Sequence, residues 1–376
     1  LRIMLGHAIL LLIIGCLLSR VIVVNRIHEL IATKVMQSFA PKTEFGLVMI
    51  MMITAIFLSM WISNTSVVAM LIPVVTTLGD ELSISCKCML LAISYGATLG
   101  GMLTPIGTPA NLVAVAYASS YFGIDIDFAM WFGWVAPFVM MLFSVIAIFF
   151  YFSTDREQLE ARVKNIDVSR SQKKVMACLS ICILLWGTQT LPLGGWSAII
   201  GMKVPEEIIG LFFLLMLLVV RRSDGSRAFG FNDFKMISYN SICMVLTGLF
   251  MADALVSGGV IRMVISALSE SSILDNYQAL AVFGFMLSFI TELCSNTAVT
   301  AMGLPLAQIM LKISNLEALP CIFMITLSAN SSFMLPTSTP PNALILGTGR
   351  LSSRYMLVCG LALSLSSLVL LIYCLL

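Results

Sequence analysis

Two clusters of small polar residues interrupt long apolar stretches of the chain, and they do so in the same way. Ser63-Asn64-Thr65 ends one apolar run, and Ser295-Asn296-Thr297 ends another 232 positions later. Serine, asparagine and threonine cap the N-termini of helices and supply neutral oxygen atoms. Inside apolar sequence, these residue types are candidates for binding an ion or a polar ligand.

A second pair of interruptions is rich in proline. Residues 105–111 read PIGTPAN, and residues 336–342 read PTSTPPN, 231 positions later. Proline has no N–H to donate and clashes with the preceding turn, so a regular helix is not expected to run through either segment. Four interruptions at matching positions predict an internal repeat, in which each half contributes one hairpin and one broken helix to a shared site.

The predicted geometry of these interruptions suits both signs of charge. Each triplet opens the second arm of a helical hairpin, so its backbone N–H groups and the positive end of the helix dipole favour an anion. The first arms end in free carbonyl oxygens, which suit a small hard cation. Backbone that leaves a helix inside a bilayer needs such partners, because lipid offers none.

Composition places these motifs in a membrane. Hydrophobic residues make up 59% of the chain and charged residues 11%, with a mean hydropathy of +1.02, which excludes an ordinary soluble domain. Several apolar stretches reach the length of about 20 residues that crosses a hydrocarbon core. The sequence therefore predicts an all-α polytopic membrane protein. Its cysteines are scattered and His7 and His28 lie far apart, so we expect neither an enzyme nor a Cys/His metal site, and no nucleic-acid partner.

The expected elements follow from the apolar runs. They are a span (5–24), an interfacial arm (26–38), a hairpin (45–78), a broken span (89–121), a span (130–152), three further spans (175–191, 208–220 and 241–256), a second arm (259–269), a second hairpin (279–311), a second broken span (321–346) and a last span (355–373). The expected domains are first-repeat scaffold and arm (1–43), first transport unit (44–152), cytoplasmic linker (153–174), second-repeat scaffold and arm (175–278) and second transport unit (279–376).

The distribution of basic residues orients this arrangement. Most of the 21 Lys and Arg residues fall on one side of the expected membrane, so that side is cytoplasmic and the C-terminus is outside. An odd number of crossings separates the hairpins, so the second half is inverted relative to the first. An inverted repeat with two interrupted helices is typical of secondary transporters, whose site lies near the bilayer midplane.

Simpler interpretations of the same residues remain. A single Ser-Asn-Thr triplet also suits a packing surface between helices, and a single proline-rich segment suits a kink. The repetition of both motifs in register favours a site. Two carboxylates inside spans, Glu292 and Asp253, are further functional candidates. Glu292 would carry a proton, orient the second hairpin or take part in a structural pairing.

With these motifs the sequence resembles the divalent anion/sodium symporters, a family that carries di- and tricarboxylates or sulfate. The likeness extends from Leu5 to the C-terminus and rests on the two Ser-Asn-Thr tips, on Gly-Thr-Pro-Ala-Asn and on Ser-Thr-Pro-Pro-Asn. It implies a homodimer in which each protomer has a scaffold domain and a moving transport domain. It also implies an elevator-type motion of the transport domain, with residues 26–38 and 259–269 as the interfacial arms.

The resemblance implies particular ligands as well. The first sodium ion would be held by Ser59, Ser63, Asn64 and Gly107. The second would be held by Thr291, Ser295, Asn296 and Ser338. The substrate carboxylates would meet Asn64, Thr65, Thr108, Asn296, Thr297, Thr339 and Pro340.

One part of the family pattern has no counterpart in the sequence. Moving residues 175–220 back by the repeat offset gives positions before residue 1, so the first-half partners of two spans are absent. We expect roughly 80–90 residues of scaffold to be missing at the N-terminus, because one span needs about 20 residues. The four motifs are complete, whereas the expected dimer scaffold is not.

Charge balance predicts the coupling ion. Burying an unpaired charge near the bilayer centre costs several kcal/mol, so a dianion there needs compensation. None of the four motifs contains Lys, Arg or His, and helix ends supply only about half a charge each. We therefore expect Na⁺-coupled symport of a dicarboxylate such as succinate across the plasma membrane. The alternatives are an anion exchanger or a sulfate or citrate carrier on this fold, an arsenite or proton-coupled permease, and a non-transporting membrane sensor.

Overall fold

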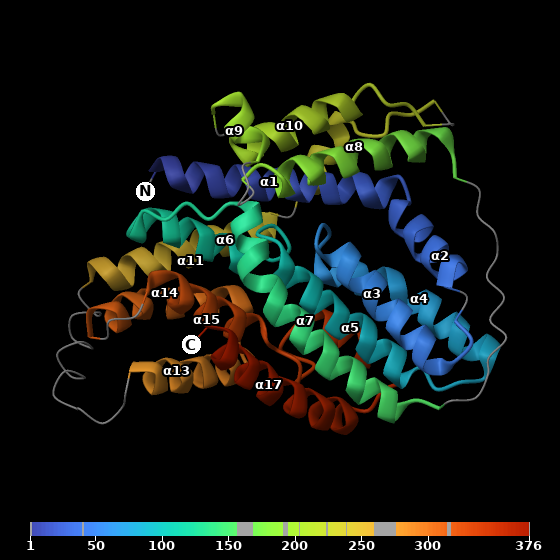
Figure 1. Ribbon diagram of the computed structural model, residues 1–376. Coiled ribbons are helices and arrows are strands. Elements are labelled where there is room, and N and C mark those ends of the chain that lie inside the picture. The colour runs from blue at the N-terminus through green and yellow to red at the C-terminus, as the bar shows by residue number, and fades with distance from the viewer. Residues whose placement is uncertain are drawn as a thin grey trace.

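The computed structural model describes residues 2–39, 41–155, 168–190, 195–202, 204–222, 225–237, 239–258, 276–313 and 317–375. Almost all regular structure in these ranges is helical, as the sequence predicted (Figure 1). The expected second arm, residues 259–269, lies outside the described residues. The same is true of most of the expected linker.

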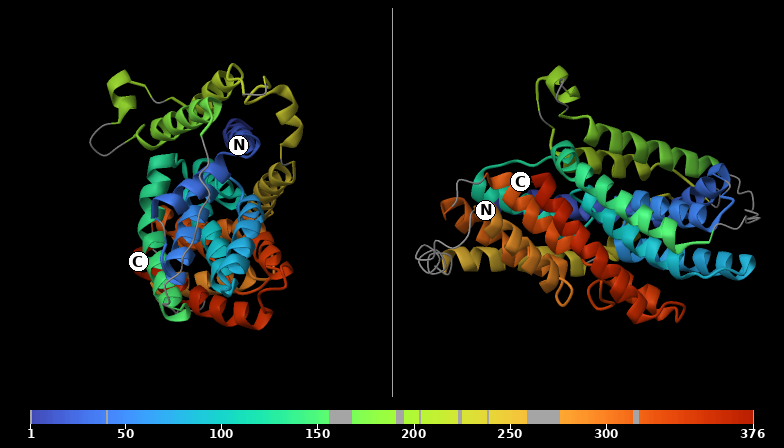
Figure 2. Two further views of the ribbon diagram at one scale, coloured as in Figure 1. Left: turned by 90° about the vertical axis from the view of Figure 1, so that its right-hand side faces the viewer. Right: turned by 60° about the horizontal axis from the view of Figure 1, so that its bottom comes forward.

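One group of helices lies at the top of Figure 1. It comprises α1 (Arg2–Val24), α8 (Arg170–Gly187) and α10 (Glu206–Leu217), with the short α9 (Trp196–Ile200) beside them. Both views in Figure 2 also show α8 and α10 at the edge of the molecule. The packing is close, because a Cβ added at Gly210 of α10 would lie 2.4 Å from Ile14 Cγ2 of α1 and 3.1 Å from Trp186 Cζ2 of α8.

Asn25, which is buried, fixes the end of α1. Its Nδ2 donates to the Ala228 carbonyl (2.9 Å), its Oδ1 accepts from Arg222 Nε (3.1 Å), and its carbonyl accepts from Gln172 Nε2 (3.1 Å). Arg26 then takes a left-handed φ of +53°, and α2 (Ile27–Phe39) leaves at a bend of 66°. One polar side chain thus holds the corner where the helix expected to act as an arm begins.

The first half continues through the hairpin and a broken helix. Its elements are α3 (Glu44–Ser59), α4 (Asn64–Leu82), α5 (Lys87–Leu103), α6 (Pro109–Tyr117) with its π-helical end η1 (Ala118–Phe122), and α7 (Phe128–Ser153). The hairpin arm α3 lies directly on α5. A Cβ at Gly100 would come within 2.1 Å of the Ile56 carbonyl oxygen, so only glycine permits this approach.

The second half also contains a hairpin, a broken helix and a final long helix. Its elements are α11 (Tyr239–Ser257), preceded by the 3₁₀ helix η2 (Phe231–Met236), then α13 (Asn276–Ile290), α14 (Asn296–Ile313), α15 (Ala318–Asn330), α16 (Pro340–Gly347) and α17 (Ser353–Leu375). Helices therefore stop and restart at all four interruptions seen in the sequence.

Helix length and surface character agree with a bilayer environment. Among the described residues, three helices, α4, α7 and α17, are long and apolar enough to cross a membrane, and the bent pair α1–α2 makes a fourth candidate. The apolar helices α3, α5, α13 and α15 are shorter because each ends at an interruption. Large apolar side chains, among them Val358 and Val369, lie exposed on the surface, as expected for residues that face lipid.

Candidate functional site

The tip of the first hairpin is built around Asn64. Helix α3 ends at Ser59 and α4 begins at Asn64, with Ser63 as its N-cap. The buried Ser59 Oγ donates to Asn64 Oδ1 over 2.6 Å, and Ser63 Oγ accepts from the Ser66 N–H over 3.3 Å. The hydroxyl of the first arm therefore holds the amide oxygen that opens the second arm.

The first broken helix wraps around this tip. A Cβ added at Gly101 would lie 2.5 Å from Asn64 Oδ1, and one added at Gly107 would lie 2.4 Å from the Gly101 carbonyl oxygen. Thr104 Oγ1 donates to the Met60 carbonyl over 2.7 Å and ties the break to the tip. Ser59, Asn64 and Gly107, three of the residues proposed for the first sodium ion, thus meet around Gly101, and Ser63 adjoins them.

The second hairpin repeats this contact. Thr291 is offset from Ser59 by the same 232 positions that separate the asparagines, and its Oγ1 lies 2.8 Å from Asn296 Oδ1. The same hydroxyl lies 2.5 Å from the Ala329 carbonyl oxygen at the end of α15. Ser332 Oγ also donates to Asn296 Oδ1, over 3.3 Å. Neutral hydroxyl, amide and carbonyl oxygens thus gather at each tip, which is a donor set that suits Na⁺.

Ser338, expected beside the second sodium ion, forms two hydrogen bonds within its own break. Its Oγ donates to the Leu335 carbonyl (2.6 Å) and accepts from Asn342 Nδ2 (3.1 Å). The hydroxyl that reaches Asn296 in this structure is that of Ser332. Ser295 is half-buried at the tip, next to Asn296.

The residues expected to meet the substrate lie at helix N-termini. Thr108 caps α6 and accepts from the Asn111 N–H, and Thr339 caps α16 and accepts from the Asn342 N–H. Pro340 is the first residue of α16. Thr65 and Thr297 are the second residues of α4 and α14; Thr297 is buried and Thr65 half-buried. Four helix N-termini thus carry small hydroxyl or amide groups, an arrangement that favours an anion.

Two hydrogen bonds join the broken helices of the two halves. Asn330 Nδ2, at the end of α15, donates to Asn111 Oδ1 of α6 over 2.9 Å, and Ser94 Oγ of α5 donates to Asn342 Oδ1 of α16 over 2.7 Å. Each asparagine also donates to a carbonyl of its own break: Asn111 to Thr104 (2.8 Å) and Asn342 to Leu335 (3.2 Å). Asn111 and Asn342 therefore each close their own break and join it to the other half.

The buried Glu292 holds the second break. Its Oε1 accepts from the Phe333 and Met334 N–H groups (2.8 and 2.9 Å), and its Oε2 accepts from the Leu335 N–H (2.8 Å). These N–H groups lie in the loop between α15 and α16, where no helix supplies an acceptor. The matching position in the first half, 232 residues earlier, is Met60, where the backbone carbonyl accepts from Thr104 instead.

Asp253, the second carboxylate singled out in the sequence, forms a hydrogen bond that joins two helices. Its Oδ1 accepts from Tyr121 Oη over 2.7 Å, which links α11 to the π-helical end of α6. The carboxylate therefore lies away from the four interruptions.

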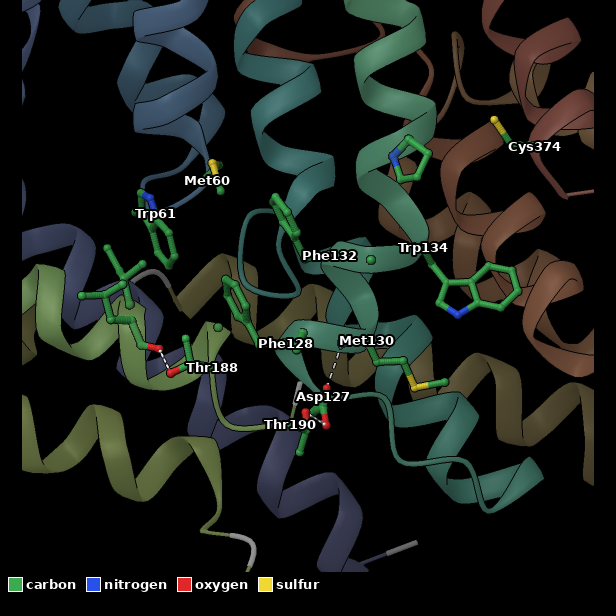
Figure 3. A pocket seen from close by; sticks show the side chains of 16 residues that line it. Met60, Trp61, Asp127, Phe128, Met130, Phe132, Trp134, Thr188, Thr190 and Cys374 are labelled. Atoms are coloured by element: carbon green, nitrogen blue, oxygen red, sulfur yellow. Dashed lines mark hydrogen bonds between the residues drawn. The ribbon is translucent and has the colours of Figure 1, made fainter. Parts of the chain in front are cut away.

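A cavity of about 1040 Å³ adjoins the first hairpin tip (Figure 3). Met60 and Trp61 line it on one side, and α7 residues such as Phe128 and Trp134 line the other, with Asp127 nearby. Trp61 stacks on Phe128 with ring centroids 5.6 Å apart and on Trp186 of α8 at 6.4 Å. The tip of the hairpin thus rests against α8 through aromatic rings, beside a largely apolar hollow.

Several residues of this site have no signal in the sequence. Ser94 lies within an apolar run, Asn330 lies in the polar stretch 328–332, and Thr104 directly precedes the first proline-rich interruption. None of the three shows in the sequence which distant segment it contacts. Asn111 and Asn342 did stand in the repeated motifs, and their 231-residue offset marks them as equivalent.

Two hairpins, two broken helices and an apolar exterior define a membrane transporter with a polar internal site. The model of a family described as citrate transporters matches residues 2–327. The chain belongs to this family, and the resemblance to the divalent anion/sodium symporters is confirmed.

Known relatives are similar over most of the chain. The sodium-dependent dicarboxylate transporter SdcS of Staphylococcus saprophyticus is 25% identical over 373 residues, which cover 92% of this chain and 71% of that protein. An uncharacterized transporter of Methanocaldococcus jannaschii is 28% identical over 329 residues, covering 85% and 70%. The crystal structure of the Alcanivorax borkumensis YdaH transporter superimposes with a TM-score of 0.62 at 15% identity, covering 98% of this chain and 84% of that one. The last likeness shows the fold alone.

The close contact at Gly101 yields a prediction. In Gly101→Ala, the new methyl group would lie 2.5 Å from Asn64 Oδ1 and 2.8 Å from Nδ2, so the Asn64 amide must move. Overpacking costs about 1–3 kcal/mol, and we expect the Na⁺ concentration for half-maximal uptake to rise about tenfold. Gly133→Ala, where the added methyl meets nothing within 4 Å, is the control. Equal Na⁺ dependence in both variants would contradict this role for Asn64.

Proposed function

We propose that this protein is a secondary active transporter that couples Na⁺ to the uptake of a dicarboxylate, with succinate-like C4 acids as substrates. The observation that carries the proposal is the matched pair of tips, Ser59–Asn64 and Thr291–Asn296. In each, a hydroxyl and an amide oxygen meet at 2.6 or 2.8 Å where one helix ends and another begins. Relatives named sodium-dependent dicarboxylate transporters support both the ion and the substrate class.

The oxygens at each tip suit Na⁺ better than a proton. Hydroxyl, amide and carbonyl groups do not titrate near neutral pH, but they are the neutral hard ligands that an alkali cation takes. When Na⁺ binds, the Ser59 and Thr291 hydroxyls turn their lone pairs toward the ion rather than donating to Asn64 and Asn296. One Na⁺ at each tip then places positive charge beside the helix N-termini that face the dicarboxylate.

The larger architecture is part of the same proposal. The two halves form an inverted repeat, and α3–α7 with α13–α17 move as one transport domain against a scaffold of α1, α8, α10 and α11. The hydrogen bonds from Asn330 to Asn111 and from Ser94 to Asn342 support a single moving body, because they fasten the two halves together. The protein acts as a homodimer in the plasma membrane with its C-terminus outside.

Citrate is the second candidate substrate, since the matching family model is described as that of citrate transporters. The site binds carboxylates through helix N-termini and small hydroxyls, and this chemistry does not by itself set the spacing between carboxylates. Competition between succinate and citrate for uptake separates the two substrates.

The proposed coupling is tested by uptake into proteoliposomes that contain the purified chain. Labelled succinate should accumulate when an inward Na⁺ gradient is imposed, and uptake should fall to the level of empty vesicles when choline replaces Na⁺. Because bound cations compensate the dianion, no accumulation is expected without them. Equal accumulation in Na⁺ and choline would refute the coupling. Exchange of internal for external dicarboxylate without Na⁺ would identify an exchanger.

A further inference from the structure

A second cavity lies where α2, the first hairpin and α8 meet. It measures about 610 Å³ and separates the hairpin arm α3 from α8. Its walls are apolar and include Ile31 of α2, Phe57 of α3, and Met176 and Ile183 of α8. A cavity with such walls takes an apolar occupant.

The cavity has a polar end and an apolar end. Lys173, in the first turn of α8, lines one end, and Ile183 lines it ten residues further along the same helix. At 1.5 Å a residue, this is a length of about 15 Å, which is half of the roughly 30 Å hydrocarbon core of a bilayer. The cavity is therefore about as long as one leaflet is thick, with Trp61 of the hairpin tip also among its lining residues.

Two lysines from different helices line the cavity. Lys34 comes from α2 and Lys173 from α8, and both side chains are exposed. Within the part of the chain that the structure describes, neither takes part in an ion pair. Their charges lie on the lysine- and arginine-rich side of the protein, where the cytoplasmic leaflet carries anionic lipid.

We propose that this cavity binds an anionic phospholipid of the cytoplasmic leaflet. One acyl chain lies along α8 between Met176 and Ile183, and the phosphate sits between Lys34 and Lys173. The lipid then contacts the arm α2, the hairpin arm α3 and α8 at once. The lipid fills the space between α3 and α8, which the proposed transport motion would slide past one another. Its release or retention therefore changes the rate of that motion.

Lipid retention measured by native mass spectrometry tests the site independently of transport. The purified chain is titrated in detergent with phosphatidylglycerol and, separately, with phosphatidylcholine of the same acyl chains. We expect phosphatidylglycerol to bind more tightly than phosphatidylcholine. Lys34→Ala/Lys173→Ala should weaken its binding on the order of thirtyfold, since each lysine near an anionic surface contributes about a fivefold factor. Phosphatidylcholine binding should change little.

The control is Lys42→Ala/Lys174→Ala, which removes the same charge from the same two regions at exposed lysines that do not line the cavity. This variant should keep the preference for phosphatidylglycerol. Equal weakening in the two double variants would show general attraction to basic residues and overturn the site. Equal binding of both lipids to the unaltered chain would overturn it as well.

Filling the cavity provides a second test. Ser180 of α8 lines the cavity, and Ser180→Phe places a ring in the space assigned to the acyl chain. The variant should lose bound phosphatidylglycerol while it stays monodisperse in detergent and keeps its helical circular dichroism. A folded Ser180→Phe protein that binds the lipid as tightly as before would refute the placement of the acyl chain.

Discussion

Replacing either Asn64 or Asn296 with Ala is expected to reduce Na⁺-driven dicarboxylate uptake by about a hundredfold or more. Each amide oxygen sits at a hairpin tip within 2.6 or 2.8 Å of a buried hydroxyl, and each residue begins a helix. Hydrogen-bond-like contacts to a charged group contribute about 1.5–3 kcal/mol each. Loss of two such contacts, one to the cation and one to the carboxylate, therefore corresponds to at least about a hundredfold.

The two variants should fail in the same way, since their surroundings match. Uptake of labelled succinate is measured in proteoliposomes at equal protein content, over a range of Na⁺ concentrations. Thr76→Ala changes a half-buried residue further along α4 whose hydroxyl donates to the Pro73 carbonyl; it is the matched control and should keep normal uptake. Normal uptake in both asparagine variants would refute the site, whereas loss in one alone would restrict it to that half.

The local breaks of this fold are readable from sequence because they depend on local chemistry. Prolines and capping hydroxyls act on the residues next to them, so the ends of α3 and α15 and the starts of α4 and α16 fall at the predicted interruptions. The repeat offset adds a second signal, because it marks Asn64 and Asn296 as equivalent positions.

Contacts between distant segments are not readable in this way. Asn330 and Asn111 are 219 residues apart, and Ser94 and Asn342 are 248 apart. No local sequence feature marks Ser94 or Asn330 as a contact between the two halves rather than as a polar residue packed within one helix bundle. The same limit applies at the second tip, where the structure brings the Ser332 hydroxyl to Asn296 without any local signal in the sequence. The expected part of Ser338 in the second sodium site stays a prediction. Which serine of a break reaches the tip depends on how the loop is held.

Glu292 holds the loop between α15 and α16, and replacing this residue is expected to have the second large effect. Glu292→Ala should greatly lower the stability of the protein, because it leaves the buried N–H groups of Phe333 and Met334 and the partly buried N–H group of Leu335 without an acceptor. An unsatisfied buried donor costs about 1–3 kcal/mol, so three of them cost at least about 3 kcal/mol. Against a total stability of about 5–15 kcal/mol, this is a large fraction. We expect a fall of several degrees in Tm and loss of uptake.

Glu292→Gln separates the role of shape from the role of charge. The Gln carbonyl oxygen can replace Oε1 and accept from Phe333 and Met334, but its amide NH₂ group then faces the Leu335 N–H, which is also a donor. We therefore expect a folded protein with an intermediate Tm, in which the Leu335 segment has moved. Because Ser332 precedes this segment and contacts Asn296, the Na⁺ concentration for half-maximal uptake should rise several-fold.

Glu81→Gln removes the same charge from an exposed position on α4 and should change neither quantity. If Glu292→Gln matched the unaltered protein in both Tm and Na⁺ dependence, the hydrogen bonds of Glu292 would have no part in shaping the second tip. If it lost uptake with an unchanged Tm and an unchanged Na⁺ dependence, the carboxylate would act on transport itself rather than by positioning the loop. The expected result is a joint change in both, because one side chain holds the backbone that carries Ser332 to Asn296.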